Sequence, residues 1–450
     1  MAIQTKLASP MVGINLQAGR AMLLLAVFAT LTTASIVRAQ TFTVLHSFTG
    51  GQDGKWSVSG ITMGSPGTLY GTAYSGGTLQ QNCEAGCGTV FKPTLHNSNW
   101  IFTPLYDFPI AANPRGGITI GPGGVPFGTT SGGNGDYGTV FYVTPQPSIC
   151  HSVQCYWDET PVYAFMGGFG ILPEYSNLSF DSAGNIYGTT YYGPYPGGGA
   201  MYELMRSGET WTPILLHSFG NGNDGIRPYS NVVIDQSGNY YATTNMGGTA
   251  ELGTVVQVMP GQLYTDTVLY NFSSDQNGYG PATGLIMDAQ GNLYGTTQLG
   301  GSGGGGTIFE LSPSGGQWHF TLLYSFTGSS GPVSGNLTMD STGNVYGATG
   351  QDGLFNLGMV FKLSPSNGSW TLTDLHDFTG GSDGAYPTVN VALDSSGNLY
   401  GTAEEGVLRA GLAVRKAAAS SGKSRRSRDS GRPNPVAQLQ YHAHVNYYSQ

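Results

Sequence analysis

The motif Gly291-Asn292-Leu293-Tyr294-Gly295-Thr296-Thr297 is the strongest indication of the architecture, because versions of it occur seven times in the 450 residues. Its central aromatic residue recurs at Tyr70, Phe127, Tyr187, Tyr241, Tyr294, Tyr346 and Tyr400. Successive copies are separated by 57, 60, 54, 53, 52 and 54 residues. Spacing this regular is typical of a repeat architecture, in which each copy belongs to one structural unit.

Each repeat contains four short segments with the pattern of β-strands. In the unit that begins at Val333 these segments are 336–339, 345–349, 358–363 and 370–378. Apolar residues alternate within them, and Gly, Pro and Asn stand between them, which indicates strands joined by tight turns. Four strands make one blade, and blades set around an axis cover each other's faces. The sequence therefore predicts an all-β, seven-bladed β-propeller over residues 41–405, with four antiparallel strands in each blade.

The two ends of the repeat region predict how the ring closes. Residues 41–48 match the fourth strand of a repeat, whereas the last repeat ends after its second strand, at 397–403. We expect strand 41–48 to lie on the outside of the blade formed by residues 388–403, which would leave no open sheet edge. The third strand of that blade is expected near residue 411, where 411–415 has a suitable length but lacks the aromatic residue of the other copies.

An Asp-x-x-Gly-Asn turn precedes five of the seven motifs. It begins at Asp181, Asp235, Asp288, Asp340 and Asp394, whereas Gly64 and Gly121 replace the aspartate in the first two repeats. An aspartate at this place can accept backbone N–H groups across the turn, and glycine supplies the positive φ of a tight hairpin. We expect the motif to be scaffold, with its tyrosine buried.

The repeat as a whole also resembles a known family. The order is Gly-Asn-Leu-Tyr-Gly-Thr-Thr, then Gly-Gly, then Gly-Thr-Val-Phe-Lys-Leu-x-Pro, then Leu-His-x-Phe-x-Gly-Gly-x-Asp-Gly. This order resembles the GloVer-type tandem repeat of bacterial secreted or surface proteins, over about residues 41–403. The resemblance implies an exported, propeller-like repeat protein, and it brings no catalytic residues with it.

Residues 1–39 have the features of a secretory signal peptide. Lys6 and Arg20 precede the apolar run 21–29, and Val37-Arg38-Ala39 provides small residues for cleavage before Gln40. The alternative is a retained membrane anchor. No later segment approaches the ~20 apolar residues that a membrane-spanning helix needs. The sequence therefore predicts a secreted protein, extracellular or at the surface of the cell envelope.

Four cysteines form two local pairs, Cys83 with Cys87 and Cys150 with Cys155. In an exported chain an even number of cysteines favours disulfides, and a zinc site made from both pairs is the alternative.

Charge divides the chain into two unlike parts. Residues 41–405 contain 25 acidic and 6 basic side chains, whereas 406–450 contain 8 basic and 1 acidic. The acidic body excludes nucleic acid as a partner, because phosphate binding needs Lys and Arg. The basic, low-complexity tail 406–450 is expected to be disordered, and a frame disruption in the coding sequence is an alternative origin for it. A monomer without a cofactor is expected.

The histidines are poor candidates for catalysis. His46, His217 and His376 share one repeat position, and the other four repeats have tyrosine there: Tyr106, Tyr163, Tyr270 and Tyr324. This exchange indicates a strand residue, and no catalytic motif for a nucleophile, a metal or a phosphate appears. We therefore assign no catalytic residue.

The long, variable loops are the better place for a site. Loops that join strand 4 to the next strand 1, and strand 2 to strand 3, share one face of a propeller. An aromatic residue precedes the inner strand in five repeats: Trp56, Tyr175, Tyr229, Tyr279 and Tyr386. With Glu174, Asp224, Arg227 and Asp383 these residues are ligand-binding candidates, suited to stacking on sugar rings. The alternative is that the aromatics fill the core between blades.

The same loops contain Gly-x-Asp-Gly at Asp53, Asp224 and Asp383. These aspartates are weak calcium candidates, with an ordinary turn as the alternative. The sequence thus favours a non-enzymatic binding module whose partner is an extracellular glycan or a surface protein. Two alternatives stay open. One is a polysaccharide hydrolase or lyase with carboxylates at the channel mouth, and the other is a purely structural surface repeat.

Overall fold

The computed structural model describes residues 40–78, 83, 85–110, 112–133, 137–146, 157–173, 177–194, 197–220, 222–261, 264–273, 275–281, 283–327, 335–387, 390–403 and 411–416, with the backbone alone for 40, 41, 275 and 411–416. The predicted signal peptide, Cys150, Cys155, Glu174, Tyr175 and the tail beyond 416 lie outside these residues. No helix among the described residues has the length and apolar character to span a bilayer.

Six four-stranded antiparallel sheets follow one another along the chain. The first has β2 (Thr62–Met63), β3 (Leu69–Ala73), β4 (Thr89–His96) and β5 (Asn99–Asp107). The second has β6 (Thr119–Ile120), the short η1 turn (Pro122–Gly124), β7 (Pro126–Thr130), β8 (Thr139–Pro145) and β9 (Trp157–Ala164). The third has β10 (Ser179–Phe180), β11 (Ile186–Thr190), β12 (Ala200–Ser207) and β13 (Thr210–Ser218).

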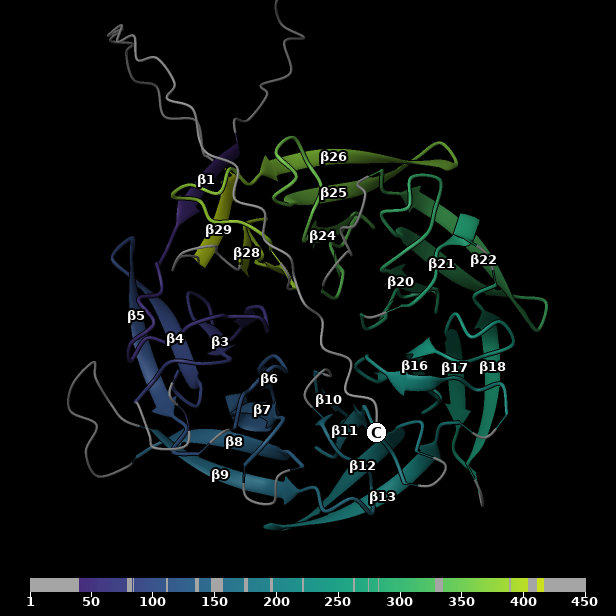
Figure 1. Ribbon diagram of the computed structural model, residues 1–450, viewed down its shortest axis with the longest axis horizontal. Helices are drawn as coiled ribbons and strands as arrows, with labels where there is room; N and C mark the ends of the chain where they lie inside the picture. The colour runs from purple at the N-terminus through teal and green to yellow at the C-terminus, as the bar shows by residue number, and fades with distance from the viewer. Residues whose placement is uncertain are drawn as a thin grey trace, which may run out of the picture. The chain divides into compact units, whose positions relative to one another are not determined.

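The other three sheets repeat the arrangement. The fourth has β15 (Val233–Ile234), β16 (Tyr240–Met246), β17 (Thr254–Met259) and β18 (Thr265–Asn271), with β14 (Ile226–Pro228) added beside β16. The fifth follows η3 (Asp275–Asn277) and has β19 (Ile286–Met287), β20 (Leu293–Thr297), β21 (Thr307–Ser314) and β22 (Gln317–Ser325). The sixth has β23 (Thr338–Met339), β24 (Val345–Thr349), β25 (Met359–Ser366) and β26 (Ser369–Asp377). Figure 1 shows these sheets as blades around a common centre, which confirms a propeller with at least six blades.

The remaining strands come from both ends of the repeat region. They are β27 (Ala392–Leu393), β28 (Leu399–Thr402), β29 (Gly411–Lys416) and β1 (Gln40–Val44). They pair in the order β1-β29-β28-β27, with β29 antiparallel to both of its neighbours.

The hairpins between strands 3 and 4 are tighter than the sequence pattern suggested. In the sixth blade the pattern placed a turn over 365–368, but β25 continues to Ser366, which pairs with Ser369. The loop is therefore only Asn367 and Gly368, with φ of 48° and 80°. Two successive positive φ values define the hairpin turn whose twist matches that of the strands, and Asn-Gly is its preferred sequence.

The 1–2 turns and the 3–4 hairpins together form what we call the turn edge of the propeller. In the fifth blade Asp288 Oδ1 accepts the backbone N–H groups of Gln290 and Asn292, both at 2.9 Å. Its Oδ2 accepts Asn292 Nδ2 at 2.8 Å and the Tyr294 hydroxyl at 3.1 Å. The same four contacts recur at Asp181, Asp235, Asp340 and Asp394. The predicted turn chemistry is therefore confirmed, and it also gives the buried tyrosine hydroxyl its partner.

The core lies between neighbouring blades. Tyr294 is 5% exposed and belongs to a cluster with Val345 and Phe361 of the next blade. The motif glycine makes room for this packing, because a Cβ on Gly295 would lie 2.5 Å from the ring of Phe309. Motif threonines add polar contacts between blades: Thr189 Oγ1 donates to the Ser230 carbonyl at 2.8 Å, and Thr243 Oγ1 to that of Thr283 at 3.0 Å.

Candidate functional site on the loop face

The 2–3 loops and the 4–1 loops form the opposite edge, which we call the loop face. The last residues of outer strands support the loop face. The residue after the repeated His or Tyr holds the 2–3 loop in several blades. Asn271 Oδ1 accepts the N–H of Thr249 at 3.0 Å, and Asp377 Oδ1 accepts that of Leu354 at 2.8 Å. The variable loops are thus mounted on regular strands, an arrangement that is common in binding proteins.

The repeated histidine itself holds the 4–1 loop, through the aspartate seven residues later. The Nε2–Oδ2 distances are 3.0 Å for His46 and Asp53, 2.8 Å for His217 and Asp224, and 3.2 Å for His376 and Asp383. Where a repeat has tyrosine, an asparagine can replace the aspartate: Asn277 Nδ2 donates to the Tyr270 hydroxyl at 2.8 Å. Sequence reasoning treated the histidines and the aspartates separately. Their occurrence in the same three repeats was the signal that they pair.

Asp224 is the most deeply buried of the three aspartates, with 2% exposure. Besides His217, its carboxylate accepts the N–H of Gly220 at 3.1 Å. Its backbone carbonyl accepts the hydroxyl of Thr254 at 2.9 Å, and that hydroxyl lies 2.7 Å from Thr244 Oγ1. Asp224 is therefore an internal anchor of the loop that leads to Arg227, and its carboxylate is turned away from solvent.

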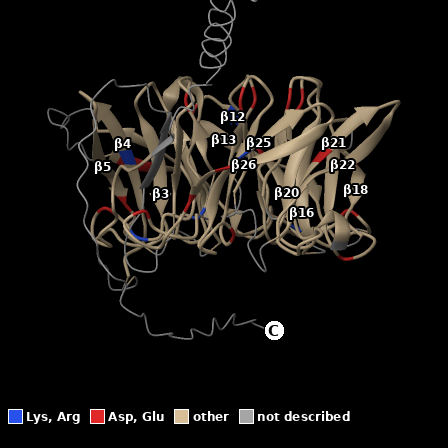
Figure 2. Cartoon of the chain, turned by 90° about the horizontal axis from the view of Figure 1, so that it is seen from above, with Lys and Arg blue, Asp and Glu red and all other residues tan. Residues whose placement is uncertain are grey.

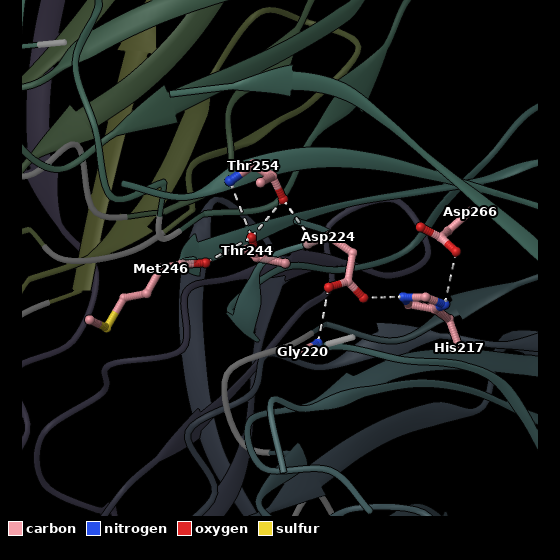
Figure 3. A network of polar contacts seen from close by, with 7 residues as sticks. All are labelled: His217, Gly220, Asp224, Thr244, Met246, Thr254 and Asp266. Atoms are coloured by element: carbon pink, nitrogen blue, oxygen red, sulfur yellow. Dashed lines mark hydrogen bonds and ion pairs between the residues drawn. The ribbon is translucent and has the colours of Figure 1, made fainter. Parts of the chain in front are cut away.

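His217 differs from its two counterparts in the side chain that lies beside its ring. His46 stacks on Phe102 and His376 on Phe42, each with ring centroids 3.8 Å apart. Beside His217 lies Asp266, with its Oδ1 3.9 Å from Nδ1. One atom each of His217, Asp224 and Asp266 lies within 4.8 Å of the others, a spacing that metal ligands can have. However, the two carboxylates approach different ring nitrogens (Figure 3), so the imidazole bridges them. This geometry favours a clamp between blades three and four.

The other two aspartates proposed for calcium also have internal partners. Asp53 accepts the N–H and the hydroxyl of Thr49 at 2.8 and 2.6 Å. Asp383 accepts the same groups of Thr379 at 2.9 and 2.6 Å. Each carboxylate closes its own loop, so the contacts favour the turn over an ion site.

The sixth-blade pair shows the electrostatic character of these anchors. Burial lowers the pKa of His376 and outweighs the opposing effect of Asp383. Burial raises the pKa of Asp383, but the hydrogen bonds from Thr379 and the nearby His376 outweigh it, so the net shift is downward. The pair therefore favours a neutral imidazole that donates to an ionised carboxylate.

The predicted aromatic candidates do not share one backbone position. Two of the aromatics, Trp56 and Tyr386, occupy the same repeat position as the predicted Arg227. These three residues have φ values of 56°, 51° and 59°. Tyr229 lies two residues after this position. In the fifth blade Gly280 holds the position, so Tyr279 lies one residue before it. A positive φ is uncommon for bulky residues. Asn113 and Leu172 have it at the same position, with φ of 47° and 59°, so this backbone conformation belongs to the repeat.

The burial of these aromatics also differs. Trp56 is 45% exposed, whereas Tyr229, Tyr279 and Tyr386 are half-buried. Tyr279 packs against the cluster between blades four and five. Trp56 is thus the clearest surface residue among the predicted candidates, and Tyr279 contributes to the core.

The richest cluster on the loop face lies where blades three and four meet. Arg227 Cζ lies 5.5 Å from the ring centroid of Tyr191, and Arg227 Nη1 donates to Met246 Sδ at 3.2 Å. The Tyr191 ring meets Tyr192 edge-on at 4.6 Å and Tyr229 edge-on at 5.2 Å. Two predicted candidates, Arg227 and Tyr229, are therefore brought together, while Tyr191 and Tyr192 were missed.

A second cluster of the same kind lies where blades one and two meet. Arg115 Cζ lies 4.7 Å from the ring centroid of Tyr74, and Lys55 Nζ lies 4.5 Å from that of Trp56. The two parts are joined, because the Tyr74 N–H donates to the Trp56 carbonyl at 2.9 Å. Tyr74 and Tyr191 occupy the same repeat position, which holds Ser131, Asn245, Gln298 and Gly350 in the other described blades. That variation was the signal in the sequence.

The repeat is similar to a known family. Residues 173–413 match the model of the Gloeobacter/Verrucomicrobia repeat. The chain belongs to this family. A search of curated proteins found no match.

Solved structures similar to this member of the Gloeobacter/Verrucomicrobia repeat family include two bacterial proteins. One is a putative 6-phosphogluconolactonase from Bacteroides uniformis ATCC 8492, with 13% identity and a TM-score of 0.44 over 72% of this chain and 90% of that chain. The other is a protein of unknown function from Dyadobacter fermentans DSM 18053, with 10% identity and a TM-score of 0.43 over 83% of this chain and 96% of that chain.

Proposed function

We propose that this protein is a non-enzymatic binding module, secreted or held at the cell envelope, that binds an extracellular glycan through its loop face. The observation that carries the proposal is the distribution of exposed apolar side chains. Among the described residues, nine large ones lie in or at the 2–3 and 4–1 loops: Trp56, Ile110, Tyr137, Met166, Tyr192, Met246, Leu299, Leu354 and Phe355. The other three, Ile101, Met205 and Leu322, lie on strands three and four, and none lies on the turn edge. Exposed apolar surface gathered on one face is typical of an interaction site.

Glycan is the favoured partner because the exposed residues include flat aromatic rings beside polar groups. Trp56, Tyr137 and Tyr192 are 45%, 44% and 40% exposed. An aromatic face offers a rigid apolar platform for the C–H face of a sugar ring, while neighbouring polar groups meet its hydroxyls. A protein partner at the cell surface is the alternative, which a lack of binding to any glycan would favour.

The contacts of the acidic candidates support binding over catalysis. A glycosidase needs two carboxyl groups that are open to the substrate from opposite sides of the bond. Asp224 is 2% exposed and is committed to His217 and Gly220. Asp383 is committed to His376 and Thr379. The internal hydrogen bonds of both carboxylates support a scaffolding role.

The experiment is a glycan-array screen with the full chain, followed by calorimetry with each glycan that binds. The double variant Trp56→Ala, Tyr192→Ala is expected to lose binding. The double variant Ile101→Ala, Leu322→Ala removes residues of similar exposure from outer strands and is expected to bind normally. Binding that is lost equally in both variants, or no binding to any glycan, contradicts the proposal.

We also propose that β27, β28, β29 and β1 form a seventh blade that closes the ring. Two contacts support it. Thr402 Oγ1 donates to the Ser57 carbonyl of the first blade at 3.0 Å, as other motif threonines do to their next blade. Tyr400 packs with Trp100 at 5.5 Å between centroids and shares a cluster with Phe91. A chain ended at Lys416 is expected to keep the unfolding temperature of the full protein, whereas one ended at Glu405 is expected to unfold earlier. Equal temperatures would exclude closure through β29.

A further inference from the structure

The basic side chains of the propeller are few, and their placement is uneven. All six basic residues between 41 and 405 lie over aromatic rings. Three of them, Lys92, Arg206 and Lys362, are on third strands. The other three are on the loop face: Lys55 lies in the loop before blade one, Arg115 between blades one and two, and Arg227 between blades three and four. Figure 2, which colours the chain by residue type, shows how sparse the Lys and Arg positions are among the Asp and Glu positions.

The two tyrosine–arginine clusters on this face are variants of one arrangement. In each, a tyrosine that follows strand 2 lies under an arginine of the next 4–1 loop, Tyr74 under Arg115 and Tyr191 under Arg227. In each, a second aromatic residue is exposed nearby, Trp56 in the first cluster and Tyr192 in the second. A cation over a ring fixes the orientation of that ring and so pre-organises it for contact with a ligand.

Between the two clusters the surface continues through blade two. Tyr137 is 44% exposed, and its carbonyl accepts the N–H of Leu172 at 2.9 Å. The Leu172 carbonyl in turn accepts the N–H of Tyr191 at 3.1 Å. An exposed aromatic thus stands between the clusters and is tied by backbone hydrogen bonds to the second of them.

We infer that this arc over blades one to four binds a neutral polysaccharide chain through two separate ring-stacking subsites, one at Trp56 and Tyr74 and one at Tyr191 and Tyr192. This inference rests on the proposed glycan binding and adds the length and the charge of the ligand. Two platforms on one face suit a chain-like ligand, because engagement of the first raises the effective concentration at the second. The acidic body, with 25 acidic and 6 basic side chains, repels polyanions, which favours an uncharged chain.

The test is calorimetric titration of the full protein with neutral cello-, xylo- and manno-oligosaccharides from disaccharide to octasaccharide, and with polygalacturonate. For the sugar series that binds, affinity is expected to rise with chain length and then level off. Tyr74→Ala and Tyr191→Ala are each expected to weaken binding of the longest oligosaccharide about tenfold. Together they are expected to abolish the dependence on length. Raising the salt concentration is expected to leave affinity unchanged, because no counterions are released.

Two further variants separate stacking from folding. Tyr74→Phe and Tyr191→Phe keep the rings and are expected to keep the affinity, and thermal unfolding verifies that each alanine variant is folded. Binding that does not depend on length, or that only one tyrosine affects, overturns the two-subsite inference while the proposed function stands. A preference for polygalacturonate that weakens with salt overturns the neutral ligand. No binding to any glycan contradicts the proposed function itself.

Discussion

The two edges of the propeller follow different rules. At the turn edge, five repeats make the same four hydrogen bonds to one aspartate, and the tyrosine that completes them is buried. At the loop face, the outer strands repeat the support of the loops, but the residues on the loops themselves differ from blade to blade. In a repeat protein of this kind, the same contacts at one edge hold each blade together, whereas the residues at the other edge can vary. A site on this protein is therefore expected where the repeats differ.

The largest expected effect separates two tyrosines. Tyr294 at the turn edge is 5% exposed, and Tyr192 on the loop face is 40% exposed. Tyr294→Ala opens a cavity between two blades and is expected to destabilise the fold by about 3–5 kcal/mol, as large aromatic truncations in cores do. Tyr192→Ala is expected to stay within about 0.5 kcal/mol of the parent protein. Urea unfolding measures both, and equal destabilisation would break the contrast between the edges.

A smaller effect tests the anchors beneath the loop face. Asp224→Ala leaves the half-buried His217 and the Gly220 N–H without their acceptor, so a loss of about 2–3 kcal/mol is expected. Asp266→Ala is the matched control, because that carboxylate is 40% exposed and lies 3.9 Å from the same imidazole. Its removal is expected to cost less than about 1 kcal/mol. If Asp266→Ala lowers the stability more than Asp224→Ala does, the imidazole is held mainly by the neighbouring blade.

The features that could be predicted from the sequence depend on residues that lie close together in the chain. The strands follow from alternation, and the Asp-led turn follows from an aspartate and a glycine three residues apart. Contacts between blades were not reachable in this way. His217 meets Asp266, and Trp100 meets Tyr400, although each pair is far apart in the sequence.

The candidate site was predicted in part. The loop face and Arg227 came from the variability of the loops. Of the five predicted aromatics, Tyr175 lies outside the described residues. Trp56 and Tyr386 occupy one repeat position, and Tyr229 and Tyr279 lie within two residues of it. Tyr74 and Tyr191 directly follow the repeated motif. The residue at this position varies from blade to blade, so the repeat pattern did not indicate it.

The smallest expected effect is a pH dependence at the turn edge. Burial raises the pKa of Asp340, but the hydrogen bonds from Asn344, Thr342 and Tyr346 outweigh it and hold that pKa below its ordinary value. A carboxyl group whose pKa is lower in the folded state stabilises the fold above its unfolded pKa of about 3.9, and this contribution fades as the pH falls. Asp340→Asn is therefore expected to be slightly less stable than the parent at pH 7, and the difference is expected to be smaller near pH 2. Because the turn is largely exposed, solvent screening keeps the difference small. Unfolding midpoints at both pH values measure it, and a difference that persists unchanged at low pH would mean that the turn depends on the shape of the side chain and not on its charge.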